Sequence, residues 1–193
     1  MSYILIAFLM LVIIAPIIAI LPSAKQKAQM AKRQQAMAGG IQVELTKIDD
    51  PDPDPEKYLS NTGKPLERRM SVAAYRIPRK RPVDWRQAPS TDWAANRVRQ
   101  GSEVIGAAVP AVGWLWDGSP DASLANDLSE FIAANLVGLP NDVARVEEKK
   151  YVISVFWQET DEVSQIIDFL ESCAAVRIEM PEDPTIDSDD FSV

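Results

Sequence analysis

The chain has 193 residues and a formal net charge of −8, a size typical of one domain with accessory segments. The acidic balance disfavours nucleic acid as the main partner, because phosphate binding requires a basic surface. The sequence has no histidine and one cysteine, Cys173, which excludes an intrachain disulfide, a His/Cys zinc site and any mechanism with a histidine base.

The charges are divided unevenly along the chain. Residues 1–43 carry four basic side chains and no acid. Residues 64–99 carry ten basic and three acidic side chains, whereas residues 100–193 carry four basic and nineteen acidic ones. The net charge therefore conceals a basic middle and an acidic C-terminal half.

Residues 3–21 form an uncharged, almost wholly apolar run from Tyr3 to Leu21. In a helix, a run of this length spans roughly the 30 Å hydrocarbon thickness of a bilayer. The alternatives are a cleaved signal peptide, which would have a basic segment before the run and a small-residue cleavage site after it, and a buried core helix. The sequence favours a single transmembrane helix, kinked at Pro16.

The flanks of this segment predict its orientation. Lys25, Lys27, Lys32 and Arg33 follow it, and no charged side chain precedes it. Under the positive-inside rule, the N-terminus lies outside and the C-terminal side lies in the cytoplasm. We therefore expect an inner (plasma) membrane protein, with the lipid bilayer as its first partner.

Residues 23–40 are expected to form a basic juxtamembrane helix. Ser23 can cap its start, and Gly39-Gly40 is a typical C-terminal signal. Its apolar face is thin, with Met30 and Met37 separated by alanines. The composition predicts either a solvated stalk, whose basic residues lie near anionic headgroups, or a helix that docks on another subunit.

Residues 41–178 are expected to form a small cytoplasmic α+β domain, an antiparallel sheet with two helices on one face. Period-two alternation predicts strands at 41–48 and 70–77, and a hairpin of 143–147 and 151–157 around a turn at 148–150. One helix is expected between Ser119, its cap, and Gly138. Thr160 is expected to cap a final helix, whose apolar side carries Cys173; residues 176–178 would add an edge strand.

Two segments of this domain are predicted as irregular. The Asp-Pro run at 49–55 cannot pair in a sheet, and it predicts an extended connection. Residues 92–118 are expected to be loop-rich, with the indoles of Trp93, Trp114 and Trp116 in the core.

A basic cluster follows the second predicted strand. Arg79, Lys80 and Arg81 are followed by Trp85 and Arg86. Such a cluster can bind anionic lipid or nucleic acid, or it can pair with the acidic half of the same chain or face the membrane. These five residues are candidate interaction residues.

Residues 179–193 carry six acidic side chains and little apolar surface, which predicts a disordered acidic tail. Phe191 within this tail is a further candidate interaction residue, because an aromatic side chain in an acidic segment can act as a short docking motif.

Motifs that bind nucleotides or carry nucleophilic catalysis are missing. The chain has no phosphate-binding glycine loop and no nucleophile elbow, and the clustered aspartates lack the glycine and glutamate positions of a calcium loop. We therefore expect no enzymatic activity, no cofactor, no metal and no small-molecule substrate, although a catalytic carboxylate pair is an open alternative.

The segment 3–45 resembles the YajC-type accessory subunit of the bacterial Sec preprotein translocase. The resemblance lies in the apolar segment, the run Lys25-Gln26-Lys27, the residues Gln29, Met30, Arg33 and Gln34, and Gly39-Gly40 before Ile41-Gln42-Val43. It implies a short outside terminus, one span, a basic glutamine-rich helix and a small cytoplasmic β-containing part.

Together these features predict a non-enzymatic, single-pass accessory or adaptor protein whose cytoplasmic domain binds another protein, such as a subunit of a membrane complex. The alternative is a membrane-surface binder or sensor whose basic cluster contacts anionic lipid or nucleic acid.

Overall fold

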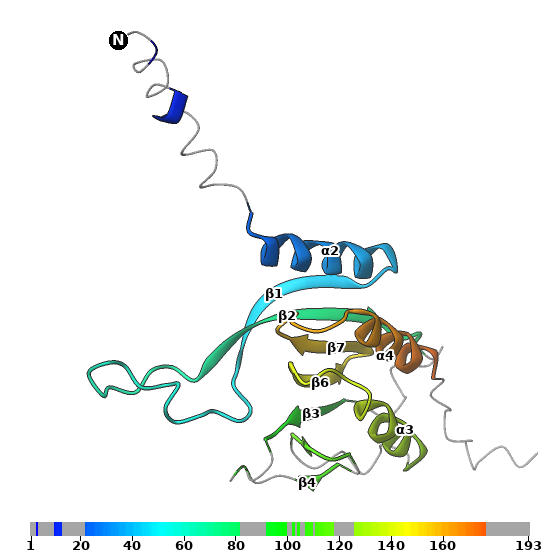
Figure 1. Ribbon diagram of the computed structural model, residues 1–193. Coiled ribbons are helices and arrows are strands. Elements are labelled where there is room, and N and C mark those ends of the chain that lie inside the picture. The colour runs from blue at the N-terminus through cyan, green and yellow to red at the C-terminus, as the bar shows by residue number, and fades with distance from the viewer. Residues whose placement is uncertain are drawn as a thin grey trace, which may run out of the picture.

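The computed structural model describes residues 22–81, 92–99, 107–109, 111–117 and 126–176, together with Tyr3, residues 10–12, Ser102 and Val104. The helices are α2 (Ala24–Ala38), α3 (Asn126–Leu136) and α4 (Ser164–Ala175). The strands are β1 (Gln42–Asp49), β2 (Arg69–Pro78), β3 (Trp93–Arg97), β4 (Ala107–Ala108), β5 (Trp114–Trp116), β6 (Val143–Lys149) and β7 (Val152–Trp157). They form one antiparallel sheet in the order β1-β2-β7-β6-β3-β5-β4, so the α+β class is confirmed (Figure 1).

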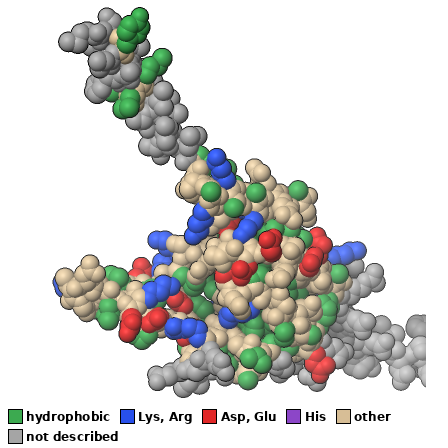
Figure 2. All heavy atoms as spheres, in the orientation of Figure 1, with side chains coloured by type: hydrophobic (Ala, Val, Ile, Leu, Met, Phe, Trp, Pro, Cys, Tyr) green, Lys and Arg blue, Asp and Glu red, His purple; other side chains and the backbone are tan. Residues whose placement is uncertain are grey.

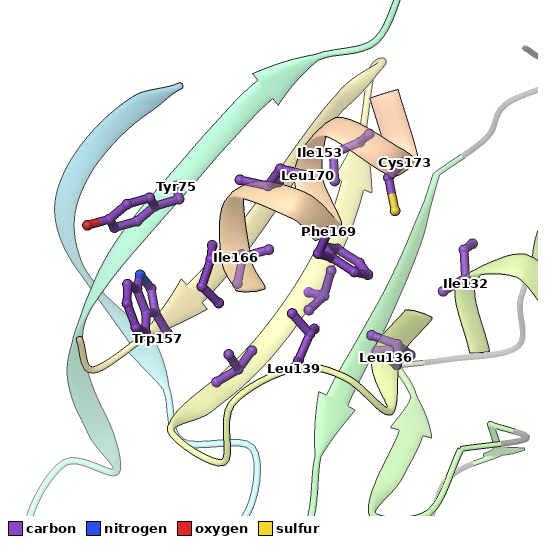
Figure 3. Close-up of a cluster of buried hydrophobic side chains, with 14 of the residues drawn as sticks. Tyr75, Ile132, Leu136, Leu139, Ile153, Trp157, Ile166, Phe169, Leu170 and Cys173 are labelled. Atoms are coloured by element: carbon purple, nitrogen blue, oxygen red, sulfur yellow. The ribbon is translucent and has the colours of Figure 1, made fainter. Parts of the chain in front are cut away.

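The main core lies between one face of the sheet and the helices. Alternate residues of β2 and β7, such as Tyr75, Ile153 and Trp157, point to this face because successive strand side chains point to opposite sides. Figure 3 shows Ile166, Phe169 and Leu170 of α4 packed over them. Each large apolar side chain buried in this way stabilises the fold by about 1.5–3 kcal/mol.

The opposite face of the sheet holds a second, smaller apolar cluster. Its members come from β2, β6 and β7: Met70, Val72, Ala74, Ala144 and Phe156. The sheet therefore buries apolar side chains on both faces.

Helix α2 belongs to the domain, which corrects the expected number of helices on the sheet. Ala36 lies in the last turn of α2 and Ile41 lies between the Gly39-Gly40 turn and β1; both are buried in the main core. Figure 1 shows α2 running alongside β1. The expectation of a solvated stalk is wrong, and three helices rather than two pack on this sheet.

The segment expected to be loop-rich contains strands. Trp93 begins β3, and Trp114 and Trp116 lie on β5. All three indoles are buried in the main core, as predicted. Periodicity was not visible in such short strands, which the sheet stabilises by pairing β3 with both β5 and β6.

The hairpin of β6 and β7 turns later than the sequence suggests. β6 continues to Lys149, and the turn falls on Lys150 and Tyr151, both with positive φ. Glu148, expected in the turn, points into the core instead. The burial of Cys173, which was predicted from the apolar side of the final helix, is confirmed.

Thr160 is not a helix cap. Its backbone N–H and its hydroxyl both donate to the Asp142 carboxylate, at 2.7 and 2.8 Å. α4 begins four residues later, after Val163, which makes no side-chain capping bond. α3 ends at Leu136, just before Gly138, as expected; the capping residue Ser119 lies outside the described residues.

Of the residues expected in the membrane span, Tyr3 is described and exposed, whereas Pro16 and Leu21 lie outside the described residues. In the described part of the chain, no helix combines the length and the apolar character needed to cross a bilayer.

Candidate interaction surfaces

Helix α2 is attached to the sheet by polar contacts. Its partly or fully buried stripe consists of Gln29, Lys32, Arg33 and Ala36, at the spacing of one helix face. Arg33 donates two hydrogen bonds to the Glu159 carboxylate, from Nε at 2.8 Å and from Nη2 at 2.5 Å. This bidentate geometry fixes the helix rotation as well as its position.

Glu159 is the centre of this junction. It is buried and has a positive φ of 61°, and its carboxylate also accepts a hydrogen bond from the Tyr75 hydroxyl at 2.9 Å. The Lys32 ammonium donates to the backbone carbonyls of Glu159 and Asp161, at 2.8 and 2.6 Å. The same ammonium lies 5.7 Å from the centre of the Trp157 ring.

The junction shifts the pKa of two of its groups. The hydrogen bond to Glu159 raises the pKa of Arg33. Burial, and then the charge of Glu159, raises the pKa of Tyr75 above its usual range.

Four basic residues follow the apolar segment. Lys32 and Arg33 are bound to the domain through these hydrogen bonds, whereas Lys25 and Lys27 are exposed.

The candidate basic cluster is only partly a surface. Arg79 is 3% exposed and donates from Nε and Nη2 to the Glu148 carboxylate, at 2.8 Å each. Its assignment as an exposed interaction residue is therefore wrong. The reason is that Arg79 Nη1 also donates to the carbonyl of Val176 at 2.7 Å, so the guanidinium ties the sheet to the end of α4.

The other basic residues of this region do gather at one end of the sheet. Lys80 and Arg81 are exposed. The backbone N–H of Arg79 donates to the carbonyl of Tyr151, which places Lys80 beside the β6–β7 turn, next to Lys150 and to Lys149 at the end of β6. Arg81 lies 5.9 Å from the centre of the Tyr151 ring. Trp85, Arg86 and Phe191 lie outside the described residues.

The connection between β1 and β2, residues 50–68, forms a projecting arm (Figure 1). The Tyr58 hydroxyl donates to Asp50 at 2.6 Å, and the Leu66 N–H donates to the Tyr58 carbonyl at 2.8 Å. Leu59 and Pro65 form an isolated β-bridge. The arm is therefore built by its own hydrogen bonds. Of the run 49–55, expected to be extended and unpaired, Asp49 pairs with Arg69, residues 51–52 bend the chain, and the first turn begins at Pro55.

The base of the arm is held against the far end of the sheet. Asp52 accepts hydrogen bonds from the backbone N–H of Arg99 at 2.7 Å, its Nε at 3.1 Å and the Ser102 hydroxyl at 2.8 Å. Burial opposes ionisation of Asp52, but the hydrogen bonds from Arg99 and Ser102 outweigh it and lower the pKa.

The outer part of the arm exposes apolar side chains among charges. Leu59 and Leu66 are each 50% exposed. Figure 2 shows both basic and acidic side chains on this projection. The exposed charged residues of the segment and of the start of β2 are Glu56, Lys57, Lys64, Glu67, Arg68 and Arg69. An ordered projection with exposed leucines is suited to contact another protein, because its shape is set before binding.

A groove of about 510 Å³ adjoins the base of the arm, between Asp52, Arg97 and Asp142. Arg97 stacks 4.7 Å from the Trp114 ring centre, and burial lowers its pKa. Its Nε atom and the Oδ1 atom of Asp142 are buried without a hydrogen-bond partner among the described residues. Polar groups of both signs in one groove favour a polar partner side chain over an apolar ligand.

Metal ligation has no support in the described ranges, where no three acidic or cysteine side chains gather at metal-binding distance.

The sequence did not predict the residues that join α2 to the domain. The stripe Gln29, Lys32, Arg33 and Ala36 has helical spacing but almost no apolar character. The signal for Glu159 was equally weak, because an isolated glutamate between a strand and a helix has no distinguishing pattern.

Comparison with protein families, curated proteins and solved structures gave no match to this chain.

Proposed function

We propose that this chain is a non-enzymatic, single-pass inner-membrane accessory protein, and that its cytoplasmic domain binds another protein through the arm. The observation that carries the proposal is the arm itself. Its backbone is ordered by internal hydrogen bonds and by the contact of Asp52 with Arg99, yet Leu59 and Leu66 extend from the sheet and are half exposed.

The α2 junction supports the tethered arrangement. Because Arg33 and Lys32 bind Glu159 and its neighbours, the helix that follows the apolar segment is continuous with the domain. A domain attached in this way would present its arm at a fixed height and direction relative to the membrane, which reduces the orientational entropy lost on binding a membrane partner.

A pull-down from detergent-solubilised membranes tests the proposal. The full-length tagged chain is expected to recover a distinct protein, and the double substitution Leu59→Ser, Leu66→Ser is expected to reduce that recovery at least tenfold. Val137→Ser is the matched control, because Val137 is a similarly exposed apolar residue (68%) at the end of α3. Recovery of the bait alone in repeated experiments would refute the adaptor function.

A second candidate function has one observation in its favour. Lys80, Arg81, Lys149 and Lys150 gather at one end of the sheet, which suits an anionic lipid surface. Co-sedimentation with anionic vesicles at low salt tests it, on a chain that starts at residue 41 and therefore lacks the apolar run. Lys80→Glu with Lys150→Glu should abolish sedimentation, and wild-type protein that stays in the supernatant would remove this candidate.

A further inference from the structure

The outer edge of β1 is unpaired. Within the residues that the structure describes, β1 ends the strand order and pairs with β2 alone. The Asp50 N–H donates to the carbonyl of Arg68, its direct opposite in the β1–β2 register. Hydrogen-bonded and non-bonded pairs alternate along an antiparallel ladder, so the N–H and C=O groups of Val43, Leu45 and Lys47 point away from β2.

The side chain at the middle of this edge is apolar and exposed. Leu45 lies opposite Ala73, which lies opposite Trp157, so the three share one row on the helix-covered face. Ala73 and Trp157 are buried, whereas Leu45 is 63% exposed. Leu45 also lines a groove of about 540 Å³, together with Gln29 and Arg33 of α2. A row of apolar side chains whose last member is exposed at an unpaired sheet edge is typical of a sheet that continues into another chain.

We propose that β1 pairs antiparallel with β1 of a second copy of this chain, with the two Leu45 residues opposite each other on a two-fold axis. Outward N–H and C=O groups of both edges then satisfy one another, and the two sheets become one. The leucines are buried against each other at the mouth of the groove beside α2.

The register follows from the side-chain pattern. Opposite residues of an antiparallel pair point to the same face, so the helix-covered faces coincide only if odd residues meet odd residues and even residues meet even ones. With Leu45 at the centre, Val43 meets Lys47, and Glu44 meets Thr46. Centring on Glu44 would oppose two carboxylates, and centring on Thr46 would separate the two exposed leucines.

Pairing with a copy is compatible with the edge itself and with the proposed membrane anchor. β1 has eight residues, an unbroken register and no proline, so it lacks two common devices that protect monomer edges. A two-fold axis perpendicular to the joined sheet places both α2 helices on one side. Both chains can then enter a single bilayer, an argument that rests on the proposed membrane anchor.

Disulfide crosslinking of the full-length chain in native membranes tests the pairing. Hydrogen-bonded opposite residues have Cα atoms about 5.5 Å apart, within the range that a disulfide spans. After oxidation, Leu45→Cys should migrate mainly at twice the mass of one chain. The wild-type chain should not, because its only thiol, Cys173, is buried.

Leu66→Cys is the matched control, because Leu66 has a comparable exposure on the arm. The register is tested by co-expressing Val43→Cys and Lys47→Cys chains with different tags. A mixed 43–47 crosslink is expected without 43–43 or 47–47 products, whose residues would lie about 13 Å apart. Equal crosslinking at positions 45 and 66, or absence of any dimer at 45, overturns the proposal.

A proline at the centre of the edge provides a second test. Leu45→Pro removes an N–H that points outward and leaves the β1–β2 ladder intact, which edge strands tolerate. Differently tagged copies should lose at least tenfold in co-precipitation while far-UV circular dichroism stays unchanged. Unchanged co-precipitation overturns the pairing.

These experiments distinguish failure of the β1–β1 pairing from failure of the proposed adaptor function. If Leu45→Cys crosslinks to a different polypeptide, the self-pairing fails and the adaptor function stands. If the arm variant Leu59→Ser, Leu66→Ser keeps the 45–45 crosslink but the wild-type chain captures no other protein, the adaptor function fails and the pairing stands.

Discussion

Arg33 of the helix α2 and Glu159 beyond the end of β7 are joined by two hydrogen bonds, 126 residues apart in the chain. Arg33→Ala leaves the buried Glu159 carboxylate with Tyr75 as its one remaining side-chain donor among the residues that the structure describes. We expect the unfolding free energy to fall by about 1–3 kcal/mol. Thermal unfolding of the full chain in detergent, followed by tryptophan fluorescence, measures the change. Lys25→Ala, at an exposed position of the same helix, should leave the transition in place, and equal effects of the two would contradict the assigned role of the pair.

The Arg79–Glu148 pair should behave as a buried ion pair. Both side chains are at most 1% exposed, and the indole of Trp93 also donates to Glu148, at 3.0 Å. Arg79→Ala should destabilise the domain by about 3–5 kcal/mol, because it removes the guanidinium that balances the charge of a buried carboxylate. The double change Arg79→Met, Glu148→Leu should recover most of that loss in the same unfolding measurement. A single change as mild as a surface substitution would show that the pair is solvated.

The base of the arm should loosen in acid. The pKa of Asp52 is lowered in the folded chain, so its contribution to stability is present above the ordinary aspartate pKa of about 3.9 and is lost as the pH falls further. A spin label on Leu66→Cys should become more mobile below about pH 4. Asp52→Asn should show that mobility at neutral pH, whereas Glu67→Gln should not. Mobility that is independent of pH would exclude Asp52 as the anchor.

Cys173 should make the fold sensitive to alkali. Burial raises the pKa of its thiol to about 12, so the folded chain retains a proton that the unfolded chain releases. Stability is complete below the unfolded pKa of about 8.5–9 and falls above it, by at most about 1.4 kcal/mol per pH unit, until the folded thiol ionises. Comparison of Cys173→Ala with wild type between pH 8 and 11 isolates this slope. Parallel stability curves would contradict it.

The membrane anchor has a direct biochemical test. The full chain should remain in the membrane pellet after alkaline carbonate extraction, whereas a chain that starts at Pro22 should be released, because residues 3–21 supply the apolar run. Release of the full chain would contradict the single-pass topology.

The sequence was informative where one face of an element is buried. The alternation in β1 and β2, the hairpin of β6 and β7 and the apolar stripe of α4, which includes Ile166 and Leu170, all correspond to observed elements. The indoles of Trp93, Trp114 and Trp116 were placed in the core correctly. Large aromatic side chains bury so much area that their location follows from their chemistry alone.

Polar contacts between distant residues were not predictable. Pairing of the basic cluster with the acidic half of the chain was one interpretation of the sequence, but only the fold identifies Glu148, 69 residues away, as the partner of Arg79. The attachment of α2 was missed for the same reason, since Lys32 and Arg33 have no apolar signature. Thr160 met Asp142 rather than the first turn of α4, because tertiary contacts compete with local capping.

Because α2 is clamped at Glu159 and passes through a short glycine turn into β1, it can act as a lever arm. A tilt or rotation of α2 imposed at Pro22 would move the sheet by a similar angle. The projecting residues 50–68 would move with the sheet as one rigid body. Torque applied at one end of this lever would thus be converted into displacement of a contact surface at the other.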